Sequence, residues 1–439
     1  MEILIKILQF LFAISILVVL HEFGHFIFAK IFKTRVEKFY LFFDPWFSLF
    51  KFKKGDTEYG IGWLPLGGYV KISGMIDESM DKEQMKLPPQ PYEFRSKPTW
   101  QRLLIMLGGV SVNFILALVI YSAILYTWGE QYLPTKNVTH GVMVDSIAYD
   151  MGLRNGDKIL SIDNEEVKDF YQIVPSIVLN EGKTLQIERN GEKREIPVPE
   201  EIIPQLLKSK GFINVRVPFY AASFTEDSQG KKAGILKGDQ LIGINHKPAI
   251  FFDEFKDSLA KYKNQEIVIT LVREKDTLDI TTLVPESGLV GVYPDGTLTN
   301  YFELESIEYT FLASIPAGIN KGMETFVSYL KQLKLIFSPK TEAYKSLGGF
   351  ITIGNIFPGE WIWQAFWNLT AFLSIILAIM NVLPIPALDG GHVMFLLYEM
   401  ITGKKPSDKV LEYAQITGMV ILLALLLFAN GNDIVRLFN

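Results

Sequence analysis

Four long apolar runs, separated by charged stretches, dominate the pattern of hydrophobic and polar positions along the chain. They extend from Ile3 to about Ala29, from Leu103 to Trp128, from Trp361 to Leu388 and from Tyr413 to Asn432. A helix that crosses a bilayer needs about 20 mostly apolar residues, so each run predicts a membrane span. With four spans, the first and the third run in the same direction, and their C-terminal ends lie on the same side of the membrane.

The stretch from Glu58 to Lys71, between the first two predicted spans, alternates glycine with β-branched or aromatic residues. Such alternation is typical of a tight β-hairpin or loop and not of a helix. At membrane depth a non-helical backbone must be buried against protein or line a wet cavity. The stretch therefore predicts either a strand edge that pairs with an extended peptide or an ordinary cytoplasmic hairpin.

The region from about 131 to 295 is charged, rich in predicted strands and contains an internal repeat. Gly152 to Asp163 matches Gly234 to Asn245 in the pattern G-Φ-x-x-G-D-x-Φ-x-x-Φ, where Φ is an apolar residue. In each copy a helix-like stretch and an alternating strand follow. The two copies resemble PDZ domains, at 131–214 and 215–295, which either bind peptides or act only as a spacer or steric lid.

Apolar residues recur at helical spacing from Ser306 to Phe337, within the 296–360 segment. This pattern predicts one or two amphipathic helices at the outer interface, with a plain packing helix as the alternative. Segments 1–130 and 361–439 are then the two membrane halves. The chain as a whole is predicted to be a polytopic α-helical membrane protein with a membrane-associated β-hairpin and two β-rich PDZ domains.

Composition agrees with this organisation, because hydrophobic residues make up 49% of the chain. A net charge of −5 gives no sign of nucleic acid as a partner, and the lack of cysteine excludes disulfides, thiolate zinc ligands and a cysteine nucleophile. The N-terminal run lacks a basic start and a small-residue cleavage site, so we expect a membrane span there and not a signal peptide. Lysine and arginine residues follow the first and third runs, which predicts that these loops are cytoplasmic and that the 131–360 region faces outward.

The sequence His21-Glu22-Phe23-Gly24-His25, near the end of the first apolar run, has the form H-E-x-x-H. Positions i and i+4 share one face of a helix, so both imidazoles can reach one metal ion. Zinc binds neutral imidazole, and a carboxylate beside it can take a proton from water. Chance occurrence is the alternative, but polar groups at the membrane end of an apolar helix usually mark a site.

A catalytic zinc usually has three protein ligands, and the two histidines leave one place open. The third run ends in N-V-L-P-I-P-A-L-D-G-G, where two prolines interrupt the helix before Asp389. Asp389 is either a helix-end residue in water or a ligand that supplies an oxygen at matching depth. His392 is the rival candidate, whereas His140 and His246 lie in the soluble modules and are expected to be surface or structural groups.

Three linked motifs carry a resemblance to a known family: H-E-F-G-H in the first span, G-W-L-P-L-G-G-Y-V-K after it, and N-V-L-P-I-P-A-L-D-G-G in the third span. Together they resemble the site-2 protease family of intramembrane zinc metalloproteases. The two PDZ-like modules between the second and third spans are similar to the bacterial regulator-of-sigma-E protease branch of that family.

The resemblance implies roles for individual residues. One Zn²⁺ would be bound by His21, His25 and Asp389, and Glu22 would be the catalytic base. The residues that would hold an extended substrate are Asn381, Pro384, Gly67, Gly68, Tyr69 and Val70. The chain departs from the family pattern at Val110, Phe350 and Asp44, where the family more often has proline, proline and glycine, and these changes concern local geometry and substrate preference.

By the same resemblance, we expect an enzyme of the bacterial inner membrane that cleaves the transmembrane segments of single-span proteins, such as anti-sigma factors or remnant signal peptides. The PDZ pair would be periplasmic and act as a size filter, with the active site toward the cytoplasm. Two other hypotheses remain open. One is a PDZ-bearing membrane scaffold or receptor with a structural metal. The other is a transporter, which predicts repeated transmembrane halves that the spans do not show.

Overall fold

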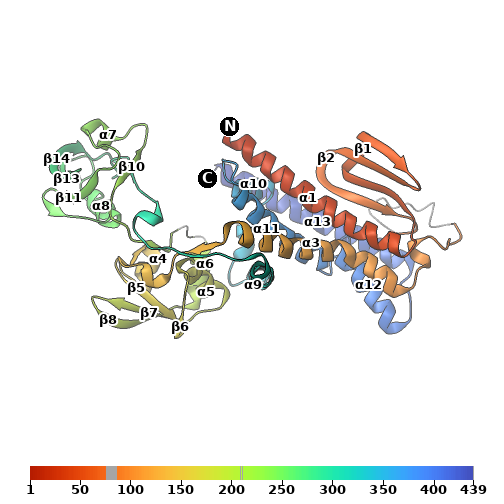
Figure 1. The fold of residues 1–439 in the computed structure, drawn as a ribbon. Helices are drawn as coiled ribbons and strands as arrows, with labels where there is room; N and C mark the ends of the chain where they lie inside the picture. Colours follow the sequence, from red (N-terminus) through yellow and green to blue (C-terminus); the bar gives the residue numbers. More distant parts are fainter. Residues whose placement is uncertain (76–86, 208, 210, 439) are drawn as a thin grey trace. The chain divides into compact units, whose positions relative to one another are not determined.

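The computed structural model describes residues 1–75, 87–207, 209 and 211–438. The chain divides into two compact units (Figure 1). The helical unit comprises Met1–Gly129, Glu308–Phe337 and Ala343–Asn439, and the β-rich unit comprises Glu130–Ile307 and Ser338–Glu342. Each unit is described by itself below.

The helical unit contains a long apolar helix at each of the four predicted spans. Within the described residues, four helices are long and apolar enough to cross a membrane; they are α1 (Glu2–Ile31), α3 (Thr99–Trp128), α11 (Trp363–Val382) and α13 (Asp408–Phe438). The third span ends six residues earlier than the apolar run, because Pro384 and Pro386 cannot continue the helix. A new helix, α12 (Asp389–Thr402), begins at Asp389.

Glycines allow α1 and α3 to cross with their backbones in contact. A Cβ atom added to Gly24 would lie 2.3 Å from the carbonyl oxygen of Gly108, and one added to Gly108 would lie 2.5 Å from that of Gly24. Helix α11 packs on the same α3, where Ala117 and Ile120 share a buried cluster with Ile375. Helix α3 is therefore the central element of the helical unit.

Two shorter helices complete this unit, α9 (Phe311–Ile336) and α10 (Phe350–Ile356). Helix α9 confirms a helix in the predicted amphipathic stretch and packs along α3 through Gly318 and Gly322. Its place at a membrane surface stays a prediction. The N-terminus of α10 is bound to α13, because the backbone N–H of Thr352 donates to the Asp433 carboxylate at 3.0 Å.

A β-sheet lies beside α1 and is built from two long strands, β1 (Val36–Lys54) and β2 (Thr57–Ile72) (Figure 1). The strands bend back on themselves, so that Tyr40 pairs with Tyr69 on one side and with Gly60 on the other. Residues 68–71 pair only with 41–38 in the described register and form an edge of this sheet. β-structure was predicted for Glu58 to Lys71, and its partner β1 was not.

The β-rich unit contains two copies of one four-stranded sheet, with strand orders β6-β5-β7-β8 and β12-β11-β13-β14. The first copy contains β5 (Lys158–Ile162), β6 (Glu165–Glu166), β7 (Thr184–Arg189) and β8 (Glu192–Pro197), with helices α4 (Ser146–Met151), α5 (Ile173–Leu179) and α6 (Ile203–Leu206). The second contains β11 (Gln240–Ile244), β12 (Lys247–Pro248), β13 (Glu266–Arg273) and β14 (Asp276–Leu283), with helices α7 (Gln229–Ala233) and α8 (Phe252–Leu259). Short antiparallel pairs join β4 (Val142–Val144) to β9 (Ile213–Val215), β10 (Ala221–Phe224) to β15 (Val292–Pro294), and β3 (Glu130–Tyr132) to β16 (Glu305–Ile307). The internal repeat is thus structural, while the PDZ assignment stays a prediction.

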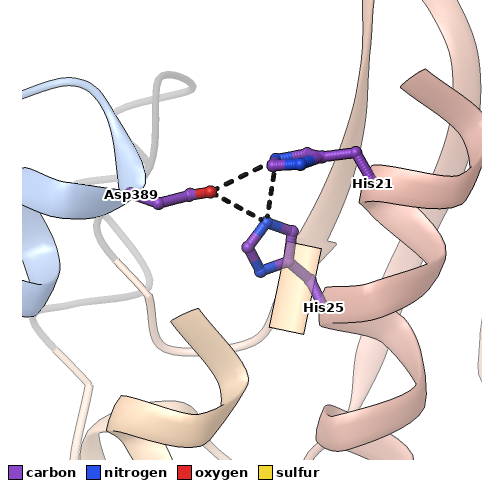
Figure 2. A group of neighbouring side chains, drawn as sticks. All are labelled: His21, His25 and Asp389. Carbon is purple, nitrogen blue, oxygen red and sulfur yellow. Dashed lines mark hydrogen bonds and ion pairs between the residues drawn. The ribbon is translucent and has the colours of Figure 1, made fainter. Parts of the chain in front are cut away.

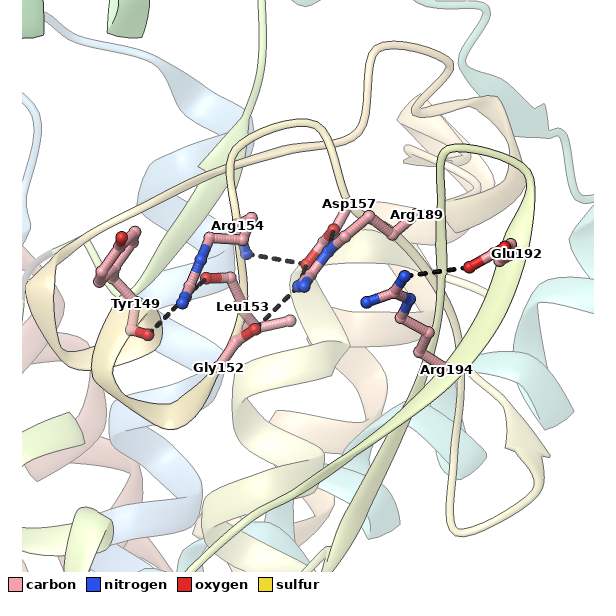
Figure 3. A network of polar contacts seen from close by, with 8 residues as sticks. All are labelled: Tyr149, Gly152, Leu153, Arg154, Asp157, Arg189, Glu192 and Arg194. Carbon is pink, nitrogen blue, oxygen red and sulfur yellow. Dashed lines mark hydrogen bonds and ion pairs between the residues drawn. The ribbon is translucent and has the colours of Figure 1, made fainter.

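The repeated Gly-Asp motif has a structural reason, shown for the first copy in Figure 3. The buried carboxylate of Asp157 accepts from Arg189 Nε and Nη2, both at 2.7 Å, and from the backbone N–H of Arg154 at 2.8 Å. In the second copy Asp239 accepts from Arg273 Nε at 2.8 Å and Nη2 at 2.7 Å. Each aspartate therefore links the loop that contains the Gly-Asp motif to the C-terminal end of a later strand, β7 in the first copy and β13 in the second.

Candidate active site

Two histidines of α1 and one aspartate of α12 meet in the interior of the helical unit (Figure 2). His21 Nε2 and His25 Nε2 are 3.2 Å apart, and Asp389 Oδ2 lies 3.2 Å from the first and 3.3 Å from the second. The i, i+4 spacing on one helix thus brings the predicted imidazoles together, and the parallel course of the first and third spans brings Asp389 to them.

Asp389 reaches this position through a tight coil between α11 and α12. Ala387 has a φ of +79°, a left-handed conformation that is unusual for a residue with a Cβ. A Cβ on Gly390 would lie 2.2 Å from the Leu383 carbonyl oxygen, and one on Gly391 would lie 2.6 Å from Pro386 Cα. The two glycines after Asp389 are therefore needed for the coil to pack against the start of α12.

The three residues fit a metal site. Their ligand atoms lie within 4.8 Å of one another. Among the described residues, these are the histidine and carboxylate side chains that lie close enough together to share one metal ion. Asp389 Oδ2 is buried and receives no hydrogen bond, so its lone pairs are directed at the two imidazole nitrogens alone. Two imidazole nitrogens and one carboxylate oxygen are a donor set that zinc accepts in catalytic sites. His392 lies in the wall of the same cavity but outside this cluster.

Glu22 lies in the wall of the same cavity, one residue after His21 on α1. The backbone of Val70 in β2 hydrogen-bonds to its carboxylate. A Cβ on Gly68 would lie 2.7 Å from Val18 Cγ1 and 3.5 Å from Glu22 Cγ, so the edge strand packs directly on α1 at this point. The predicted base and the predicted substrate-binding strand are therefore neighbours.

The cavity has a volume of about 1000 Å³ and contains most of the predicted substrate-binding residues. Gly67, Gly68, Tyr69, Val70 and Asn381 all line it. The amide nitrogen of Asn381 is 3.4 Å from His21 Nε2. Pro384 belongs to the coil after α11 and is not among the lining residues in the described part of the chain.

Asp44, where the chain departs from the family pattern, supports the edge strand. Its Oδ1 accepts from the hydroxyl of Tyr69 at 2.8 Å, and its Oδ2 accepts from the hydroxyl of Ser48 at 3.0 Å. Lys38 Nζ lies 3.9 Å from the same carboxylate. Asp44 therefore holds the side chain of Tyr69 and the turn of β1 together at the cavity wall.

Two polar residues at the site were not predicted. Asn113 of α3 is fully buried, and its amide nitrogen lies 3.2 Å from His21 Nδ1. Gln415 of α13 is 6% exposed, lines the cavity, and has no protein partner for its amide among the described residues. The signal that could have found both is an amide side chain inside an uncharged apolar run, since such groups are costly in a membrane.

Three potential metal ligands beside a carboxylate, in a unit with four helices long and apolar enough to cross a membrane, are the arrangement expected of a membrane metallopeptidase, and comparison with known proteins agrees. The model of peptidase family M50 matches residues 9–425, and the chain belongs to this family. The chain is 29% identical over 464 residues to the "Regulator of sigma E protease" of Haemophilus influenzae, covering 98% of each protein. It is 27% identical over 470 residues to the "Protease RseP" of Yersinia pestis, covering 100% of each. The resemblance predicted from the three motifs is confirmed.

Proposed function

We propose that the chain is an intramembrane zinc metalloprotease that hydrolyses peptide bonds within the transmembrane segments of single-span membrane proteins. The observation that carries the proposal is the position of His21, His25 and Asp389, which open onto a cavity that also contains Glu22 and a free strand edge. Membership of a peptidase family supports it, as do relatives named "Putative zinc metalloprotease" and "Regulator of sigma E protease".

His21 Nε2, His25 Nε2 and Asp389 Oδ2 would hold the zinc ion. Zinc bound there supplies a Lewis acid that polarises the peptide carbonyl and lowers the pKa of water. Glu22, in the same cavity wall, takes the proton from the attacking water. It then delivers that proton to the nitrogen of the leaving amine, so the carboxylate is regenerated at the end of each turnover.

A transmembrane substrate must unwind before it can be cut, because a helix keeps its carbonyls in hydrogen bonds between residues i and i−4. The edge strand 68–71 offers backbone groups that can pair with an extended segment and replace those bonds. The Asn381 amide, which lines the same cavity, would bind the same segment. Substrates that contain helix-breaking residues should therefore be cleaved faster.

The biological setting is part of the proposal. By family resemblance we expect anti-sigma factors as one substrate class and remnant signal peptides as another; the name of one relative, "Regulator of sigma E protease", supports the first. By family resemblance we expect a bacterial inner-membrane protein, and the lysines and arginines after the first and third spans favour an active site toward the cytoplasm. The repeated β-rich modules would then be periplasmic PDZ domains that exclude substrates with bulky outer domains.

Replacing Glu22 with glutamine tests the mechanism. The Glu22→Gln variant should retain zinc, because it keeps the three ligands, and should lose cleavage of a single-span substrate. Glu324→Gln, the same substitution at an exposed position of α9, is the control and should cleave normally. Appreciable turnover by Glu22→Gln would show that Glu22 is not the catalytic base. A wild-type protein that binds zinc but cleaves no membrane substrate would favour the scaffold hypothesis.

A further inference from the structure

The two imidazoles of the site can bind a cation only through nitrogens that carry no proton. Their Nε2 atoms face each other and Asp389, so these must be the ligand atoms. A neutral imidazole carries one proton, which must then lie on Nδ1 and needs a hydrogen-bond acceptor. Whatever accepts at each Nδ1 therefore decides whether the ring presents its lone pair to the metal.

His25 has such an acceptor in the backbone of α3. Its Nδ1 lies 2.8 Å from the carbonyl oxygen of Ile105, which can only accept. The Nδ1–H of His25 therefore donates to Ile105, and its Nε2 is free of a proton. The acceptor is backbone, so substitution of the Ile105 side chain leaves it in place.

His21 has Asn113 in the corresponding position, two helical turns further along α3. His21 Nδ1 lies 3.2 Å from the Asn113 amide nitrogen, while the amide oxygen is buried without a partner. The two ends of an amide fill nearly the same space, so rotation by 180° exchanges them. One amide atom lacks a partner in either orientation, but only the orientation with oxygen toward His21 accepts the Nδ1 proton.

The surroundings hold Asn113 against His21. Asn113 is 0% exposed, and its backbone carbonyl accepts from the hydroxyl of Ser374 on α11 at 2.7 Å. Gly109 lies midway between Ile105 and Asn113 on the same face of α3. A Cβ there would lie 2.4 Å from His25 Nε2 and 2.8 Å from His21 Nε2, so only glycine lets α3 approach both rings.

We propose that Asn113 is a positioning residue for the metal. Its amide oxygen accepts the Nδ1 proton of His21, and this fixes the tautomer that presents the Nε2 lone pair to zinc. The inference rests on the proposed zinc protease function, but it concerns metal binding and not turnover.

The test measures the zinc affinity of the full-length chain in detergent, by competition with a chelator of known affinity. Asn113→Leu has a similar volume and no acceptor, and it should bind zinc about 10- to 100-fold more weakly than wild type, the usual effect of losing such a partner. Asn113→Asp keeps the acceptor and should bind within about threefold of wild type, or more tightly. Asn320→Leu, the same substitution on the exposed face of α9, is the matched control and should leave the affinity unchanged.

A purely structural role would lower the melting temperature of the metal-free protein for every substitution at this position. We expect instead that metal-free wild type and Asn113→Asp melt together and show the same zinc-induced rise, while Asn113→Leu shows a smaller rise. If Asn113→Leu cannot be purified, Asn113→Ala takes its place. The inference is overturned if the variant without an acceptor binds zinc as tightly as wild type, or if Asn113→Asp loses as much affinity as that variant. A wild-type chain that binds no zinc would instead overturn the proposed function.

Discussion

Replacing Gly418 with alanine should disable the site, although Gly418 is not among the described residues that line the cavity. A Cβ on Gly418 of α13 would lie 1.6 Å from the Pro386 carbonyl oxygen, whereas real Cβ atoms keep at least 3.0 Å, so the two must separate by about 1.4 Å. The coil cannot retreat, because Gly391 packs against the Cα of the same Pro386 from the α12 side. The displacement must therefore shift Asp389, three residues later, or move α13 and Gln415 away from the cavity.

Either movement is large on the scale of catalysis, because a misplacement of about 1 Å can cost about 100-fold in rate. Overpacking of this kind also lowers the free energy of unfolding by about 1–3 kcal/mol. The assay compares cleavage of a single-span substrate, zinc affinity and melting temperature with those of Gly431→Ala. That control makes the same substitution on the same helix, where a Cβ would meet nothing within 4 Å. Its only expected effect is a gain of about 0.5–1 kcal/mol in helix stability. If Gly418→Ala cleaves within a few-fold of Gly431→Ala, the inferred contact between α13 and the coil is wrong.

Two further predictions concern the edge strand and the β-rich unit. Gly68→Ala would place a Cβ 2.7 Å from Val18 Cγ1 and should push the strand away from α1. Cleavage should fall about 10- to 100-fold with zinc content unchanged, and loss of zinc would contradict this interpretation. Burial disfavours the charged form of Asp239, but hydrogen bonds from Arg273 and a backbone N–H outweigh it and hold the pKa of Asp239 below its ordinary value of 3.8. The stabilisation from this pair is therefore present above pH 3.8 and is lost as the pH falls through the lower folded-state pKa. The protection factors of the β11 and β13 amides, which correct for the pH dependence of intrinsic exchange, should fall over that range in wild type. An identical pH dependence of these factors in Asp239→Asn would rule out this source.

The spans and the histidine pair could be predicted because their signals are periodic. Long apolar runs and an i, i+4 pair of histidines follow directly from helix geometry. The position of Asp389 required only that the first and third spans run in the same direction. The coil between α11 and α12 could not be predicted, because nothing in the sequence around Ala387 indicates a left-handed backbone at that residue.

Strand β1 was missed for two physical reasons. Its sequence V-E-K-F-Y-L-F-F-D-P-W-F-S-L-F-K-F-K-K has aromatic residues on both faces, so it lacks the alternation of a strand with one face in water. Pro45 also lies in its middle, and proline argues against a strand interior. The structure accommodates it in a bend, where Phe42 and Trp46 have φ values of +65° and +72°. The same absence of alternation follows naturally if both faces of the sheet lie in apolar surroundings.

Gly24 shows how much the motif H-E-F-G-H specifies beyond two metal ligands. It lies between His21 and His25, and it is the residue at which the backbones of α1 and α3 touch. That contact brings the face of α3 with Ile105, Gly109 and Asn113 against the two imidazoles. A side chain at Gly24 would separate the helices and remove the acceptors of both Nδ1 protons, although every ligand would remain in the sequence. The metal site therefore depends on the crossing of two helices as well as on the two histidines that the motif makes easy to recognise.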